Sequence, residues 1–233
     1  MDFLTQIEIE AIWLSLKISL WSMIWTMPLG LIAAWCLARF EFPGKVFIDS
    51  IIHLPLVLPP VVIGYVLLVS FGKKGFIGAW LYEVFGITFG FSWRGAVIAA
   101  SVMAFPLIVR AIRLSIEAVD QRLEAAARTL GAGPAYVFTT ITFPLIMPGI
   151  VAAFILGFAR CLGEFGATIT FVSNIPGETR TLPIALYGFA QIPGGEEAAF
   201  RLVIISVVIA FLSLAGSEWL ARRTQAKIGQ NHA

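Results

Sequence analysis

The sequence predicts an all-α integral membrane protein that crosses the bilayer about five times. Hydrophobic residues make up 59% of the chain and charged residues 13%, whereas a soluble domain carries roughly 25% charged residues. A soluble fold of 233 residues cannot bury so much apolar surface. Several apolar runs also approach the about 20 residues that a helix needs to cross the hydrocarbon core. The composition therefore excludes an ordinary soluble fold, and the length suits one domain or at most two.

Five apolar stretches are the predicted spans. The first is expected to remain in the chain as a membrane helix, because the residues before it are acidic and a secretory signal has a basic n-region. The second contains three prolines, which we interpret as kinking or starting a membrane helix. In chain order the spans are residues 11–38, 51–71, 94–114, a fourth that begins near Phe143, and 200–219.

The distribution of basic residues predicts the direction of the chain. Short cytoplasmic loops carry an excess of lysine and arginine. With the acidic N-terminus outside, more of the loop lysines and arginines fall on the cytoplasmic side than outside. We therefore expect residues 1–10 outside, a membrane domain over residues 11–222 with a cytoplasmic loop at 117–144, and a cytoplasmic tail at 223–233.

The fourth span is too long for one straight helix. Residues 143–172 are apolar except near residue 160, and as a single helix they would be about 45 Å long. The hydrocarbon core is only about 30 Å thick. The helix must tilt, kink or break, and Gly163 and Gly166 are the natural places. After it, residues 181–192 predict a short amphipathic helix on the outer surface, with Thr181 as its N-cap and Pro183 in its first turn.

An ionisable pair lies inside this fourth span. Arg160 and Glu164 are spaced i,i+4 and are expected to pair on one helix face. Charged residues within membrane segments are costly, usually face the interior of a bundle and mark a functional site by default. We therefore take Arg160, Glu164, Thr168 and Thr170 as the candidate translocation path. A structural ion pair that clamps a kinked helix is an equally good interpretation.

The stretch "EAAARTLGAG", residues 124–133, predicts a short charged helix between the third and fourth spans. Residues 122–130 favour a helix, Gly131 is the expected C-cap, and Pro134 prevents simple continuation. A helix this short is marginal alone, so its own spans or a partner must hold it. Three alanines leave it thin enough for another protein's groove to approach closely. The candidate docking residues are Leu123, Glu124, Ala126, Ala127, Arg128, Leu130 and Gly131; the alternative is a solvated connector.

At this loop a family resemblance becomes visible. "AAARTLGAGPAYVFTTITFP" resembles the cytoplasmic loop of permease subunits in ABC importers, whose pattern is Glu-Ala-Ala, three residues, Gly, nine residues, then Ile-x-Leu-Pro. Ala126 and Ala127 take the two alanine positions, whereas Ala125 takes the glutamate position and Glu124 lies one residue early. Phe143 replaces the leucine. "RCLGEFGATITFVSNIPGETRT" and other segments look like the permease subunit of molybdate transporters, so the resemblance covers nearly the whole chain.

The resemblance implies a type I ABC importer permease with a coupling helix in the cytoplasm. It implies a bacterial inner-membrane protein that pairs with a second copy of itself, two cytoplasmic ATPase subunits and an extracytoplasmic molybdate-binding protein. The chain is not expected to be an enzyme, because it contains no G-x-x-x-x-G-K-[ST] phosphate loop; ATP and magnesium would bind the ATPase partner.

Several alternatives stay open. A tungstate or sulfate permease belongs to the same class, since the path residues do not distinguish tetrahedral dianions. An ATP-independent channel or carrier and a membrane scaffold belong to other classes. No cofactor is expected in this chain, because cysteine and histidine are too few for a metal site, and the net charge of +2 gives no reason to expect nucleic acid as a partner.

Overall fold

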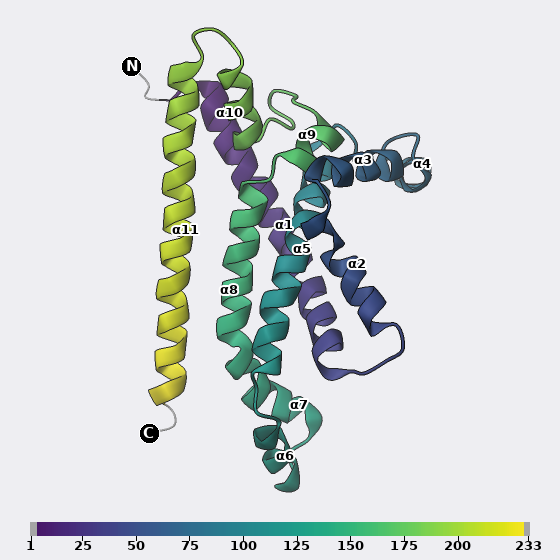
Figure 1. The fold of residues 1–233 in the computed structure, drawn as a ribbon, viewed down its shortest axis with the longest axis vertical. Coiled ribbons are helices and arrows are strands. Elements are labelled where there is room, and N and C mark those ends of the chain that lie inside the picture. Colours follow the sequence, from purple (N-terminus) through teal and green to yellow (C-terminus); the bar gives the residue numbers. More distant parts are fainter. Residues whose placement is uncertain (1–3, 231–233) are drawn as a thin grey trace.

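The computed structural model of the protein describes residues 4–230, and these form helices and loops with no strand. The expected all-α class is therefore confirmed. Long helices run along the molecule and shorter ones lie across its upper end or protrude below (Figure 1). The helices are α1 (Gln6–Arg39), α2 (Lys45–Val57), α3 (Pro60–Phe71), α4 (Phe76–Phe85), α5 (Trp93–Glu117), α6 (Gln121–Thr129), α7 (Pro134–Val137), the π-helix η1 (Phe138–Thr142), α8 (Phe143–Leu162), α9 (Gly166–Val172), α10 (Leu182–Ala190) and α11 (Glu196–Gln230).

The long helices match the predicted spans. By length and composition, four helical stretches in residues 4–230 are able to cross a membrane, and a fifth is added if the bent pair α2–α3 is counted as one. The first, third and fifth predicted spans lie within α1, α5 and α11. The fourth lies in α8, which η1 and α7 extend toward the lower end of the molecule.

The second predicted span is not one helix. Residues 51–71 are divided between α2 and α3, whose axes are bent by 113°. Leu58 and Pro59 between them have extended backbones. Proline lacks an N–H group and disfavours a helical conformation in the residue before it, so Pro59 and Pro60 end α2 and begin α3. The helix α3 then lies across the long axis, against α9 (Figure 1).

The core lies where α5 packs between α1 and α8. Ile108 of α5 is fully buried between two glycines, Gly30 of α1 and Gly157 of α8. A Cβ atom at either glycine would come within 2.7 Å of the Ile108 side chain. Small residues allow helices to approach closely in a membrane protein, so these glycines set the spacing of the central helices.

The predicted break in the fourth span is confirmed. The helix α8 ends at Leu162 with Gly163 as its C-cap, and α9 begins at Gly166. The predicted outer helix is also present as α10. Thr181 occupies its N-cap position, but the expected side-chain cap is not formed and the Thr181 hydroxyl has no hydrogen-bond partner. The second helical residue, Pro183, has no N–H for a cap to accept, and the Ser15 hydroxyl of α1 accepts a hydrogen bond from the first one, Leu182, at 2.6 Å.

Candidate functional site

The helix α6 is capped at both ends by its own sequence. At its start, the Asp120 carboxylate accepts a hydrogen bond from the Arg122 backbone N–H group at 2.9 Å. At its end, Gly131 has φ +88°, which glycine adopts without a steric penalty. The Ala132 and Gly131 N–H groups bond to the Ala127 and Arg128 carbonyls at 3.1 and 3.0 Å. This is a Schellman motif. Gly131 therefore ends the helix as expected, although the C-cap position itself is Leu130.

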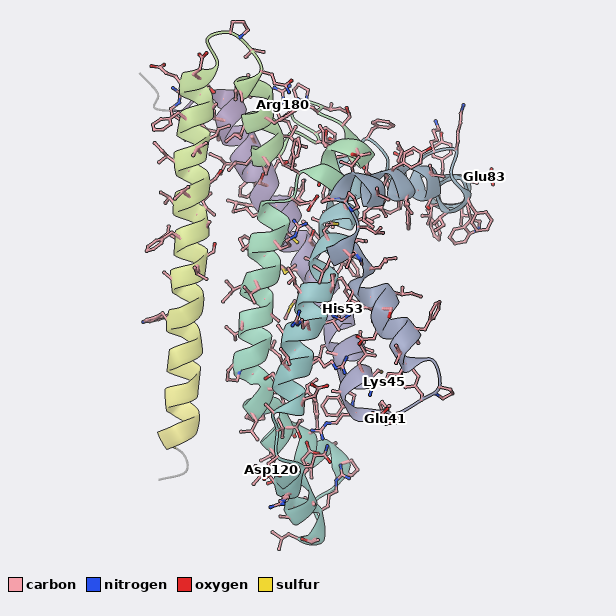
Figure 2. All side chains as sticks on the ribbon, viewed as in Figure 1. Glu41, Lys45, His53, Glu83, Asp120 and Arg180 are labelled. Atoms are coloured by element: carbon pink, nitrogen blue, oxygen red, sulfur yellow. The ribbon has the colours of Figure 1, made fainter. Side chains whose placement is uncertain are left out.

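Most predicted docking residues of α6 lie on its free surface. Leu130 is 88% exposed and Leu123 is 50% exposed. Ala126, Arg128 and Gly131 are also exposed, and Ala127 is half-buried. The helix is at the end of the molecule opposite the N-terminus, where Figure 2 labels Asp120. The fold thus presents a short helix with apolar side chains, which is suited to a groove on another protein.

Glu124 differs from the other predicted docking residues. It is only 9% exposed and points toward its own chain. Its Oε1 atom accepts a hydrogen bond from Arg39 Nη2 at 2.5 Å and another from Thr142 Oγ1 at 2.8 Å. Both donors bond the same oxygen and belong to the chain itself, so Glu124 also makes an internal contact; its docking role stays a prediction.

The structure brings Arg160 and Glu164 together at the break between α8 and α9. Arg160 Nη1 lies 2.5 Å from Glu164 Oε2, and the two side chains are 27% and 2% exposed. Glu164 Oε1 also accepts the Ala167 N–H bond at 2.8 Å, near the start of α9, where a negative charge is favourable. Glu164 is therefore fully engaged, and Arg160 is the partly exposed member of the pair.

The two threonines of the candidate path do not join this pair. Thr168 is buried in α9. The Thr170 hydroxyl donates to the Gly166 carbonyl at 2.8 Å, within its own helix. Among the hydrogen bonds of residues 4–230, none links either threonine to Arg160 or Glu164. The translocation role of the four residues stays a prediction.

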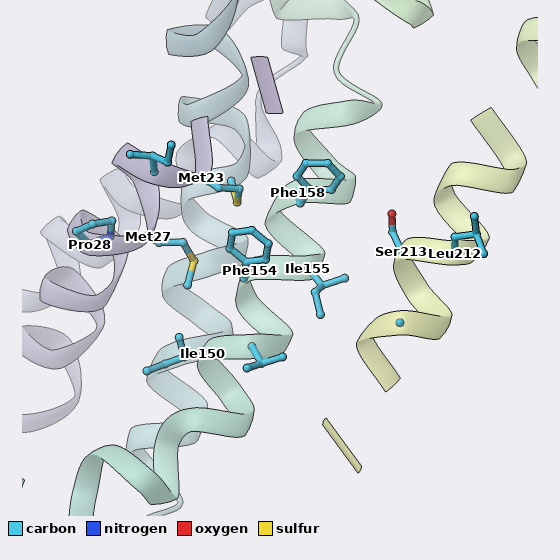
Figure 3. Close-up of a pocket in the computed structure, with 12 residues that line it drawn as sticks. Met23, Met27, Pro28, Ile150, Phe154, Ile155, Phe158, Leu212 and Ser213 are labelled. Atoms are coloured by element: carbon cyan, nitrogen blue, oxygen red, sulfur yellow. The ribbon is translucent and has the colours of Figure 1, made fainter. Parts of the chain in front are cut away.

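A large cavity elsewhere in the molecule is apolar. It has a volume of about 780 Å³ and lies between α1, α8 and α11. Figure 3 shows Met23 and Met27 on one side, Phe154 and Phe158 along α8, and Leu212 with Ser213 on α11. Its lining offers no charged group and little hydrogen bonding to an anion. Desolvating a charge without such partners is costly, so this cavity is not suited to a path for anions.

Sequence reasoning did not identify Arg39 and Thr142 as partners of Glu124. They lie 85 and 18 residues from it in the chain, beyond the reach of helical periodicity. The π-helix that contains Thr142 was also missed, because an i to i+5 pattern leaves no simple sequence signature. Among the side chains that the structure describes, no group of three or more histidines, cysteines, aspartates or glutamates is gathered.

Comparison with known proteins identifies the family. A family model described as "Binding-protein-dependent transport system inner membrane component" matches residues 26–226. The chain belongs to this family. It has the type I ABC importer permease fold, with several apolar helices of an inner-membrane component.

Close relatives within the family carry a substrate name. The molybdenum transport system permease protein ModB of Escherichia coli (strain K12) is 62% identical, over 97% of this chain and 99% of its own. ModB of Haemophilus influenzae (strain ATCC 51907 / DSM 11121 / KW20 / Rd) is 59% identical, over 97% and 98%. A solved structure titled as inward-facing conformations of the MetNI methionine ABC transporter has a TM-score of 0.71 at 15% identity, covering 95% of this chain and 99% of that one. That likeness supports the fold.

Proposed function

We propose that this chain is the permease subunit of an ATP-driven importer of molybdate. The observation that carries the proposal is the 62% identity to a molybdenum transport permease over 97% of the chain. In this proposal a second copy completes the membrane pathway, two ATPase subunits bind on the cytoplasmic side, and an extracytoplasmic protein delivers the anion. ATP and magnesium act on the ATPase subunits, and this chain performs no hydrolysis of its own.

The orientation of the chain in the membrane is part of the proposal. The distribution of basic residues places the N-terminus and α10 outside, and α6 with the C-terminal tail in the cytoplasm. The exposed apolar side chains Leu123 and Leu130 then face the ATPase subunits. ATP binding must favour one conformation of the assembly over another, and α6 is the element that passes this preference to the membrane helices.

The path for the anion is proposed to run past the break between α8 and α9. Arg160 supplies a positive charge that is partly exposed, and Glu164 holds its guanidinium in place. Thr168 and Thr170 complete the candidate path on α9. Because the pairing already satisfies much of the arginine's charge, the site is weak. A weak site suits a permease, since a strong one would trap the dianion.

Reconstitution in proteoliposomes tests the proposal. The purified chain is combined with its ATPase subunit and binding protein, and uptake of labelled molybdate is measured with and without ATP, in the presence of excess sulfate or tungstate. We expect uptake only with ATP and all three components. Uptake without the ATPase subunit indicates a channel or carrier, and an ATPase subunit that binds without any uptake indicates a scaffold. Preferential competition by sulfate indicates a sulfate permease.

A further inference from the structure

The helix α6 is tied to the rest of the chain through one buried carboxylate. On a helix of nine residues whose other side chains are mostly exposed, Glu124 is the buried one. Arg39 and Thr142 both donate to its Oε1 atom. Within the described part of the chain, these two bonds are the side-chain hydrogen bonds that join α6 to other helices. We call Arg39, Glu124 and Thr142 the Glu124 cluster.

The two partners of Glu124 stand at the ends of long helices. Arg39 is the last residue of α1, a helix of 34 residues that extends to the end of the molecule opposite α6 (Figure 1). Thr142 is the last residue of η1, and α8 continues directly from it. A displacement of α6 therefore acts at once on the ends of two membrane helices that both pack on α5.

The surroundings make the cluster stiff. The Arg39 guanidinium lies over the Trp35 ring, 5.3 Å from its centroid, and Trp35 meets Phe138 of η1 edge to face at 5.2 Å. The end of α1 and the π-helix are thus also packed together through aromatic rings. Removing one partner of a buried charge pair is strongly unfavourable, because the other charge is left unpaired. The bonds of Glu124 are therefore expected to persist while α6 moves.

We propose that the Glu124 cluster transmits movement of α6 to α1 and α8, and that its three members are positioning residues for transport. The π-helix is where the coupling loop meets α8, and single π-helical turns are frequent at functional sites. Its last residue, Thr142, is the one that donates to the carboxylate. This inference rests on the proposed function, since it assumes that an ATPase subunit moves α6.

Two measurements on the assembled importer test the inference. The first is hydrogen exchange of the α6 amides in lipid nanodiscs, which reports how firmly the helix is held. The second is the number of molybdate ions imported for each ATP hydrolysed. Glu124→Gln removes the charge at constant size. Glu41→Gln is the matched control, because Glu41 belongs to an exposed pair with Lys45 near the same end of α1 (Figure 2).

In Glu124→Gln we expect exchange at residues 121–130 to rise at least about tenfold, because the amide oxygen still accepts both bonds but the partly buried Arg39 loses its opposite charge. We expect uptake for each ATP to fall at least about fivefold, the lower end of typical couplings between sites. The double variant Arg39→Glu with Glu124→Arg exchanges the two charges. It should restore part of the protection of the α6 amides and part of the uptake for each ATP, because the ion pair is formed again and the Thr142 hydroxyl is able to accept from arginine. Glu41→Gln should change neither.

Two results overturn the inference. In one, the α6 amides of Glu124→Gln exchange as slowly as those of the unmodified protein, so the cluster does not hold the helix. In the other, exchange rises but uptake for each ATP is unchanged, so the contact is structural only. An unmodified assembly that hydrolyses ATP without importing molybdate counts instead against the proposed function, and hydrogen exchange still shows whether the cluster holds α6.

Discussion

The close approach of α3 to α9 predicts that Gly64→Ala destabilises the protein. A Cβ atom at residue 64 would lie 2.5 Å from the Ala167 carbonyl oxygen and 2.8 Å from Thr170 Cβ, whereas ordinary contact begins at 3.4 Å. The helices must therefore separate by about 1 Å, and the obstructing atom is backbone, which a rotamer change does not relieve. Overpacking costs about 1–3 kcal/mol, and we expect the upper half of that range.

The assay is thermal unfolding of the purified protein, followed by the loss of monodisperse protein on heating. For a chain of this size, 1 kcal/mol shifts the midpoint by about 2–4 °C, so a cost of about 2–3 kcal/mol in Gly64→Ala should lower it by about 4–12 °C. Gly163→Ala is the matched control, because its new methyl group meets nothing closer than 3.7 Å. An unchanged midpoint in Gly64→Ala would show that α3 does not pack on α9 as described.

Three further predictions concern transport and docking. Arg160→Ala should lower molybdate uptake at least about tenfold per folded protein, as expected when a charged hydrogen-bond donor is lost, and full uptake in a stably folded variant contradicts its place on the path. Gly131→Ala forces alanine into φ +88° in the folded protein, which costs about 1 kcal/mol, so the full-length variant should unfold a few degrees lower than the unmodified protein, and an unchanged midpoint contradicts the left-handed end of α6. Leu130→Asp puts a charge on a side chain that is 88% exposed, so it should leave thermal stability nearly unchanged. It should reduce the amount of ATPase subunit that co-purifies with the chain, and an unchanged amount would show that Leu130 is not part of the docking surface.

The membrane helices were predictable because their signals are local. Apolar length located the spans, and the glycines at 163 and 166 located the break, since a helix running through them would have exceeded the bilayer. The end of α6 followed from the cap chemistry of Gly131, and its body from the helix formers at residues 122–130, whereas the N-cap Asp120 was not predicted. Each of these features depends on residues that are contiguous in the chain.

The features that sequence reasoning missed depend on distant contacts. Pro59 and Pro60 indicated a kink, but the 113° bend also needs α9 as a surface on which Gly64 allows α3 to lie. Glu124 looked like surface charge because its partner Arg39 is 85 residues away. The Thr181 hydroxyl does not cap α10: the second helical residue, Pro183, has no N–H to donate, and the Leu182 N–H is bonded by Ser15 of the first helix. Bonds between residues so distant in the chain are decided by the tertiary packing.

The central claim, that α6 is where an ATPase subunit acts on this chain, is tested most directly by photo-crosslinking. A photoreactive residue in place of Leu123 is activated in the assembled, importing complex, and the adducts are identified by mass spectrometry. The account predicts an adduct with the ATPase subunit and loss of ATP-driven uptake once it forms. An adduct with the extracytoplasmic binding protein, or no protein adduct from a complex that imports at the full rate, would contradict it.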